Sequence, residues 1–139
     1  MLFTPKKWKF RKLQKGKKLN TINKLNTLNT LLFGKLGLKA IQCGRLTSKQ
    51  LSAMRQTINK IIKKKGKLKI NIFPHLQVTK KPLEVRMGKG KGNVDRWIFK
   101  VRTGTLLCEI ETPNTLIGLQ ALKLAQYKLP FLTKITNKI

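Results

Sequence analysis

Acidic residues are what this sequence lacks most. Its 139 residues include only Glu84, Asp95, Glu109 and Glu111, against 32 lysines and arginines, which gives a net charge of +28. No acid precedes Glu84, whereas the first 83 residues carry 22 of the 32 cations. A charge of this size repels itself and needs a polyanion close by. Nucleic acid is the first candidate for that polyanion, and an anionic membrane surface is the second.

Side chains that bind metals or carry out catalysis are also scarce. Cys43 and Cys108 are the only cysteines and His75 is the only histidine, which is too few soft ligands for a zinc site. We therefore expect no metal, no cofactor, two buried reduced thiols and a structural or exposed His75. Four scattered carboxylates and one histidine supply no nucleophile with a base and no acid–base pair, so no catalytic residue is predicted.

Long apolar runs are absent as well. No stretch approaches the roughly 18 apolar residues of a membrane-spanning helix, so we expect no span. A protein of the membrane surface would need a long basic amphipathic helix, whereas the apolar stripes of this chain belong to short capped helices with strands between them, so we expect no membrane partner. The first residues lack the apolar core of a signal peptide, and they are rich in lysine rather than in the arginine and serine of an import presequence. We therefore expect neither segment in the chain as given.

What the chain has in abundance is lysine, with 26 lysines and six arginines. Lysine is a compact point charge suited to phosphate, whereas arginine matches planar edges. The composition therefore favours binding to a phosphate backbone over the reading of bases. The frequent Lys, Asn and Ile also resemble the usage of an A+T-rich genome.

Residues 1–18 read as a basic arm in which aromatic residues alternate with cations. Rings can stack on bases while lysines meet phosphates, so this pattern suits RNA, with a solvated tail as the alternative. The candidate RNA-binding residues of the arm are Lys6, Lys7, Trp8, Lys9, Phe10, Arg11, Lys12, Lys15, Lys17 and Lys18. Residues 19–31 repeat Leu-Asn-Thr with a period that fits neither a helix nor a strand, which predicts an irregular or partly disordered connector. We divide the chain into arm and connector, 1–30, and one domain, 31–139.

Two helices are predicted from their ends and their apolar spacing. Residues 47–65 begin with Thr47 and Gln50 as a capping box, and Gly66 is the expected C-cap. Residues 112–129 begin with Thr112 as N-cap and Pro113 in the first turn. The expected buried stripes are Leu51, Met54, Ile58, Ile61 and Ile62 in the first helix, and Leu116, Leu119, Leu122 and Ala125 or Gln126 in the second.

Strands are predicted where apolar and polar residues alternate, at 31–41, 67–73, 77–79, 94–102, 105–111 and 131–139. A short turn at Thr103 and Gly104 joins two of them. Two helices are too few for an alternating β/α sheet. The predicted fold class is therefore α+β, with two helices packed on one face of a mostly antiparallel sheet, a basic N-terminal arm and a long Gly/Lys loop.

That loop, residues 80–93, is hereafter called the finger. Glycine permits positive φ and close approach of another backbone, so alternating Gly and Lys describe a mobile cationic loop that can press its main chain against phosphates. A solvated surface loop is the alternative. We expect few packing contacts to depend on Arg86, Lys89 and Lys91. The candidate residues of the finger are Lys80, Lys81, Arg86, Met87, Gly88, Lys89, Gly90, Lys91 and Gly92.

Five cations of the domain are further candidates for RNA contact: Lys35, Lys39, Arg45, Lys63 and Lys64. The lysines at 63–65 also lie in the last turn of the first helix, where the helix dipole favours cations. Phosphate binding and that dipole role remain alternatives for these lysines.

Several motifs in order along the chain are similar to those of one family. They are Met1, Leu2, Pro5, Lys6, Lys9, Phe10, Arg11 and Lys12 at the start, then Phe33, Gly34, 37–40, 44–47, Gly66, Lys67, Phe73, Pro74, Thr79, 81–83, 85–93, 123–125, 128–130 and Lys134. Together they resemble protein sixteen of the large ribosomal subunit, bacterial type. The block 85–93 is the most specific piece, and the match covers nearly the whole chain.

The resemblance implies an α+β protein on large-subunit rRNA, beneath the central protuberance. It implies that the finger reaches toward the peptidyl-transferase centre and the acceptor arms of tRNA, and that the protein joins the subunit late in assembly. Its implied partners are rRNA, tRNA and neighbouring ribosomal proteins; it is neither an enzyme nor a homo-oligomer. Relatives are usually rich in Gly and Arg where this chain has Leu-Asn-Thr repeats. That departure, a family-like start at Met1 and the A+T-like usage favour a mitochondrial ribosome, with a plastid or the bacterial cytoplasm as alternatives.

Overall fold

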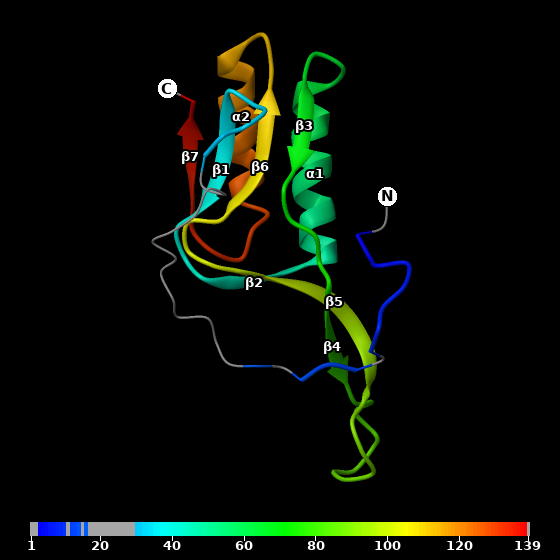
Figure 1. Ribbon diagram of the computed structural model, residues 1–139. Helices are drawn as coiled ribbons and strands as arrows, with labels where there is room; N and C mark the ends of the chain where they lie inside the picture. The colour runs from blue at the N-terminus through cyan, green and yellow to red at the C-terminus, as the bar shows by residue number, and fades with distance from the viewer. Residues whose placement is uncertain (1–2, 11, 15, 17–29, 139) are drawn as a thin grey trace.

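A computed structural model describes residues 3–10, 12–14, 16 and 30–138 of the chain. In chain order the elements are β1 (Leu36–Ala40), β2 (Gly44–Thr47), α1 (Ser48–Ile62), β3 (Lys67–Ile70), β4 (Leu76–Lys80), β5 (Asn93–Val101), β6 (Leu106–Glu111), α2 (Thr115–Gln126) and β7 (Thr133–Asn137). Both helices lie side by side against one face of a sheet, and a second sheet extends away from them toward the finger (Figure 1). The predicted α+β class is confirmed.

The strands form two antiparallel sheets rather than the single sheet that was expected. One has the order β3-β6-β1-β7 and the other β2-β5-β4. The turn at Thr103 and Gly104 joins β5 to β6, yet these two strands belong to different sheets. At this turn the Gly104 N–H donates to Ala40 O at 2.8 Å, and the Ala40 N–H donates to Thr105 O at 2.9 Å. These bonds to the end of β1 lead the chain from the second sheet into the first.

The start of α1 follows the sequence pattern closely. The Gln50 N–H donates to Thr47 Oγ1 at 3.3 Å, and the Thr47 N–H donates to Gln50 Oε1 at 3.0 Å, which completes the predicted capping box. The helix ends earlier than predicted, because Lys63 adopts φ +54° and its N–H donates to Asn59 O. Gly66 is therefore not the C-cap. This glycine instead lets the backbone come close to β6, because an added Cβ would lie 2.7 Å from Glu111 O.

The predicted start of α2 is wrong. Asn114, not Thr112, is the N-cap, since its side-chain oxygen accepts from the Leu116 N–H at 2.9 Å. Leu116 was expected in the buried stripe but is 73% exposed. The buried residues of α2 are Gly118, Ala121, Leu122 and Ala125. Three of these four are small, so α2 packs close to the sheet; a Cβ at Gly118 would lie 2.6 Å from Leu36 Cδ1.

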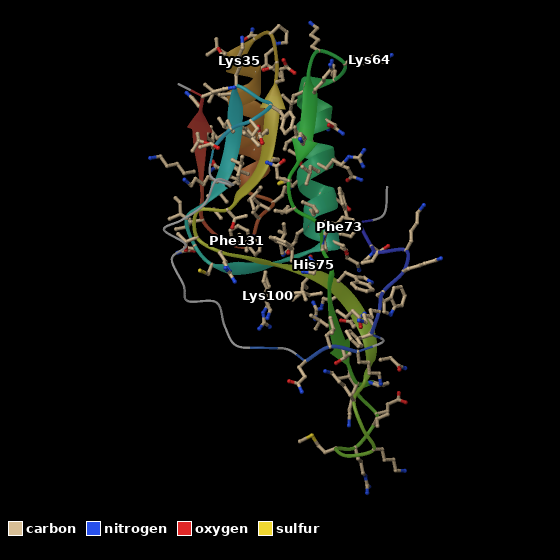
Figure 2. The ribbon with its side chains drawn as sticks, in the orientation of Figure 1. Lys35, Lys64, Phe73, His75, Lys100 and Phe131 are labelled. Atoms are coloured by element: carbon tan, nitrogen blue, oxygen red, sulfur yellow. The ribbon has the colours of Figure 1, made fainter. Side chains whose placement is uncertain are left out.

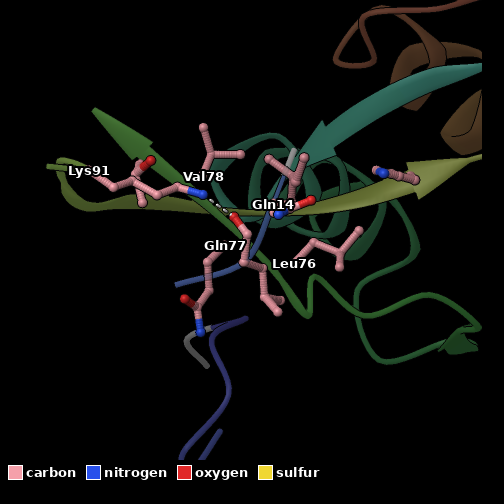
Figure 3. Close-up of a pocket in the computed structure, with 9 residues that line it drawn as sticks. Gln14, Leu76, Gln77, Val78 and Lys91 are labelled. Carbon is pink, nitrogen blue, oxygen red and sulfur yellow. Dashed lines mark hydrogen bonds between the residues drawn. The ribbon is translucent and has the colours of Figure 1, made fainter. Parts of the chain in front are cut away.

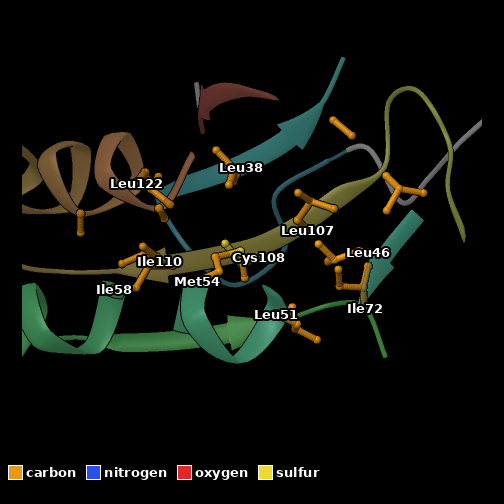
Figure 4. Packing of buried hydrophobic residues seen from close by; sticks show 14 of the residues in the cluster. Leu38, Leu46, Leu51, Met54, Ile58, Ile72, Leu107, Cys108, Ile110 and Leu122 are labelled. Carbon is orange, nitrogen blue, oxygen red and sulfur yellow. The ribbon is translucent and has the colours of Figure 1, made fainter. Parts of the chain in front are cut away.

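The core lies between the two helices and the four-stranded sheet (Figure 4). The α1 residues Leu51, Met54, Ile58 and Ile62 are buried as predicted, and Ile61 packs at the edge. Phe3 of the arm also belongs to this core, with 8% of its surface exposed. Within the described residues, no helix is long and apolar enough to cross a membrane.

The two cysteines and the histidine have different surroundings. Cys108 is completely buried, but Cys43 is only half-buried, so the expectation of two buried thiols holds for Cys108 alone. Both are free thiols. His75 is exposed, and its ring meets the edge of Phe99 with centroids 5.7 Å apart.

Candidate nucleic-acid interface

The finger extends from the end of the β4–β5 pair that lies farthest from the helices (Figure 1). Pairing of Lys80 with Asn93 closes its base. Leu83 and Met87 are 95% and 98% exposed, so neither is held by the core. Gly88, Lys89 and Gly90 have φ values of +100°, +51° and +84°, three consecutive left-handed conformations. The finger thus presents both main chain and cations to its surroundings.

The cations of the finger divide into two groups. Lys81 Nζ donates to Gly88 O within the finger, and Lys91 Nζ donates to Leu13 O of the arm. Lys12 Nζ in turn donates to Lys91 O at 2.5 Å. The expectation that few contacts depend on Lys91 is therefore wrong: this lysine ties the finger to the arm. The second group is Lys80, Arg86 and Lys89, which are exposed.

The root of the finger depends on one close backbone approach. An added Cβ at Gly92 would lie 2.5 Å from Lys80 O and 2.9 Å from Lys81 N, both on the opposite side of the loop. At Gly88 and Gly90, by contrast, nothing lies within 4 Å of an added Cβ. The glycine at the root is needed for space, and the two glycines nearer the tip are needed for their positive φ.

Beyond Phe3, the arm contacts the three-stranded sheet through Trp8 and Phe10. The rings of Trp8 and Trp97 meet edge to face with centroids 5.2 Å apart, and Gln77 Nε2 donates to Phe10 O at 2.8 Å. Leu13 and Gln14 close a pocket of about 120 Å³ against β4, β5 and Lys91 (Figure 3). No local pattern in the sequence predicts these contacts, because Gln77 and Trp97 lie far from the arm along the chain.

The arm still exposes much of its cationic and aromatic surface. Lys6, Lys7 and Lys9 are exposed, and Trp8 and Phe10 are 51% and 57% exposed. Lys9 Nζ lies 5.5 Å from the Phe10 ring centroid. Lys12 is half-buried through its contact with the finger. The candidates Arg11, Lys15, Lys17 and Lys18, and the connector from 19 to 29, lie outside the described residues.

A separate group of cations lies at the end of the molecule opposite the finger. Lys35 and Lys64 line an open hollow of about 450 Å³ together with Lys65 and Lys67 (Figure 2). Lys63 is exposed beside them. The other two candidates, Lys39 on β1 and Arg45 on β2, are half-buried. The predicted residues are therefore not one continuous patch: the fold separates the arm and finger from this lysine cluster.

Comparison with known proteins shows the family of this cationic chain. A family model described as "Ribosomal protein L16p/L10e" matches residues 5–136. The chain belongs to the L16p/L10e family. It is 47% identical over 138 residues to "Large ribosomal subunit protein uL16" of Wigglesworthia glossinidia brevipalpis, covering 99% of this chain and 98% of the relative. Proteins of the same name from Acinetobacter baylyi and Leptospira biflexa are 44% and 45% identical over 137 residues, with the same coverage.

In this member of the L16p/L10e family, one functional group that sequence reasoning missed is Glu109. This residue is 2% exposed in the middle of β6. The N–H groups of Leu32, Phe33 and Gly34 donate to Oε2 at 2.7–3.1 Å, and Asn71 Nδ2 donates to Oε1 at 2.8 Å. Burial alone would raise the pKa of Glu109, but these hydrogen bonds outweigh burial and lower the pKa below its ordinary 4.5.

The Glu109 contacts explain why β1 begins at Leu36 rather than at 31. The backbone donors of residues 32–34 are taken by the carboxylate, so they are not available to a strand partner. Gly34 allows the approach, since an added Cβ there would lie 2.5 Å from Ile110 O. An acid within an apolar strand was the feature of the sequence that could have indicated the role of Glu109.

Among the described residues, no three His, Cys, Asp or Glu side chains gather in a way that could hold a metal ion.

Proposed function

We propose that this protein is a structural constituent of the large ribosomal subunit that binds large-subunit rRNA. Membership of the L16p/L10e family and the name of its relatives, "Large ribosomal subunit protein uL16", support the proposal. The observation that carries it physically is the surface: exposed lysines at the arm, the finger and the opposite end, on a chain of net charge +28. Phosphates are the partner that this surface fits.

The parts of the chain have separate roles in this proposal. Residues 1–30 form the arm and connector, and residues 31–139 form one RNA-binding domain. The arm contacts rRNA through lysines and through the exposed faces of Trp8 and Phe10. Lys35 and Lys64 contact a second stretch of rRNA. The protein acts as a single copy among other ribosomal proteins, and its role is structural rather than catalytic.

The finger is proposed to lie near the acceptor arms of tRNA at the peptidyl-transferase centre. Lys80, Arg86 and Lys89 are exposed there, and the glycines let backbone N–H groups approach phosphate oxygens. Such contacts carry no base information, so they act alike on every tRNA species. The finger would position tRNA while the RNA performs peptidyl transfer.

The first test is where the protein goes in a cell lysate and how salt releases it. Tagged protein should sediment with large subunits rather than with membranes or in the soluble fraction. Binding of the purified protein to large-subunit rRNA should weaken steeply with salt. On duplex DNA, about 6–10 phosphate contacts cost roughly 10³–10⁵ in affinity between 50 and 200 mM salt. Sedimentation with membranes, or an affinity that does not change with salt, contradicts the proposal.

The relatives named above are bacterial, which points to a ribosome in a bacterium or in an organelle of bacterial origin. Within that range we propose a mitochondrial ribosome, on the basis of the Lys-, Asn- and Ile-rich composition and the Leu-Asn-Thr connector. Fractionation of the source cells tests this. Recovery of the protein with cytoplasmic or plastid ribosomes contradicts the mitochondrial assignment and leaves the ribosomal role intact.

A further inference from the structure

The two helices have very different outer surfaces. The fifteen residues of α1 include three cations, and Lys49, Gln56, Asn59 and Lys60 are exposed on its outer side. The twelve residues of α2 include one charged residue, Lys123. In a chain with 32 cations, α2 is therefore a nearly uncharged helix on the surface. A helix that met RNA phosphates would be expected to resemble α1.

The exposed side of α2 and its C-cap carries bulky apolar residues. Leu116, Leu124 and Tyr127 are 73%, 42% and 75% exposed. Leu116, Gln120, Lys123 and Tyr127 follow one another at spacings of four, three and four, so they form one stripe that ends at the C-cap Tyr127, with Leu124 beside it. The opposite side of α2 carries the residues buried against the sheet. The stripe therefore contributes nothing to the core, and folding alone does not explain its bulky apolar residues.

The partner of this stripe can be argued from charge. A second copy of the chain would bring another net charge of +28 against the same face, so self-association is disfavoured. RNA is disfavoured because its phosphates would meet few cations on the helix itself: Lys123 is the one charged residue of α2, and Lys128 follows beyond its end. An apolar protein surface fits the leucines, and Tyr127 is the type of large amphipathic side chain that anchors protein interfaces.

We propose that the outer face of α2 docks a neighbouring protein of the large subunit. Its contact surface would be apolar where it covers Leu116 and Tyr127, and acidic at the edge that meets Lys123. This proposal rests on the proposed ribosomal function, which supplies a particle in which other proteins surround the chain. It assigns α2 to protein contact, whereas the arm and finger contact RNA.

Site-specific photo-cross-linking in purified large subunits tests the proposal. Tyr127→p-benzoylphenylalanine should cross-link to a ribosomal protein, and mass spectrometry should place the cross-link beside acidic residues of that protein. The matched control is Gln56→p-benzoylphenylalanine on the outer side of α1, which should cross-link to rRNA. Leu116→Lys, combined with the probe at 127, should lower the protein cross-link several-fold because it places a second cation on the stripe.

The outcomes separate this inference from the function on which it rests. If the unaltered chain does not enter large subunits, the proposed function fails and the docking proposal fails with it. If the chain enters and the probe at 127 labels only rRNA or nothing, the docking proposal alone is overturned. If the variant at 127 is not incorporated, the probe is placed at Leu124 on the same face, and the same two outcomes decide.

Discussion

Glu109 shows at the scale of one residue how a strongly cationic chain uses an acid. The carboxylate is inside the protein, where it receives hydrogen bonds from three backbone N–H groups and from Asn71. It fixes the segment that leads into β1 and that carries Lys35. Because its pKa is lowered in the folded state, folding favours the ionised form. The stabilisation is therefore present above the unfolded pKa, near 4.5, and is lost as the pH falls through the lower folded value.

Replacing the carboxylate should weaken the fold in a pH-dependent way. Glu109→Gln should lower the free energy of unfolding at pH 7 by about 1–3 kcal/mol, because backbone donors lose a charged acceptor. The deficit should shrink as the pH falls below 4.5 and through the lower pKa of the folded state, at which the native carboxylate becomes protonated. Urea unfolding in high salt at pH 7 and at pH 3 measures the loss of unfolding free energy at each pH. The control Glu111→Gln changes an exposed acid on the same strand; an equal effect of the two variants would contradict the role of Glu109.

The two thiols should differ in reactivity. Burial raises the pKa of Cys108 to about 12, so it remains a thiol at ordinary pH and is shielded from reagents. Cys43 is half-buried, with Sγ 3.2 Å from Thr103 Oγ1. Iodoacetamide at pH 8 should modify Cys43 in the folded protein and Cys108 only after unfolding in urea, as followed by mass spectrometry. Rapid modification of Cys108 in the folded protein would contradict its position in the core.

At the scale of elements, features that depend on neighbouring residues could be predicted from the sequence, and features that depend on distant segments could not. The capping box at Thr47 and the stripe of α1 depend on residues within a few positions, and both were predicted. The start of α2 was missed because Thr112 and Asn114 are both good caps two residues apart, and hydrogen-bond geometry decides between them. The separation of β5 from β6 and the binding of the arm to Gln77 and Trp97 depend on contacts between distant segments, for which periodicity gives no information.

Two glycines of the finger allow the steric effect of an added side chain to be compared with the strain of a positive φ. Gly92→Ala should disrupt the root, since its Cβ would lie 2.5 Å from the Lys80 carbonyl oxygen. Gly90→Ala should cost only about 1–2 kcal/mol of local strain from its positive φ, with open space around it. Hydrogen exchange at the paired ends of β4 and β5 should rise strongly in the first variant and little in the second. Equal exchange in both would show that the close approach does not determine the root.

At the scale of the whole molecule, the fold distributes charge over separate surfaces. The finger and arm are joined by Lys12 and Lys91, the lysine cluster around Lys64 lies at the other end, and α2 is nearly uncharged. The sequence predicted candidate cations in the arm and the finger, and their contact with RNA stays a prediction. It could not predict that Lys81 and Lys91 hold the finger together, because that depends on which carbonyl oxygens the folded chain places near them. The cations of the finger that we propose for tRNA contact are therefore Lys80, Arg86 and Lys89.

The central claim is that these three exposed cations act on tRNA and are not required for folding or docking. The triple variant Lys80→Ala, Arg86→Ala and Lys89→Ala should be present in large subunits at full occupancy, because its arm, sheets and core are unchanged. The matched control removes three exposed cations far from the finger: Lys128→Ala, Lys134→Ala and Lys138→Ala.

The deciding measurement is the rate of aminoacyl-tRNA accommodation on purified subunits whose content of the protein has been quantified. The account predicts that the finger variant is slow with every tRNA species tested, while the control variant matches the unaltered protein. Full occupancy with an unchanged rate would contradict a role for the finger in tRNA binding. If the finger variant is lost from the subunits, these three cations are required for entry into the subunit. That result would contradict the claim that they act on tRNA alone, and it would give the finger a role in assembly.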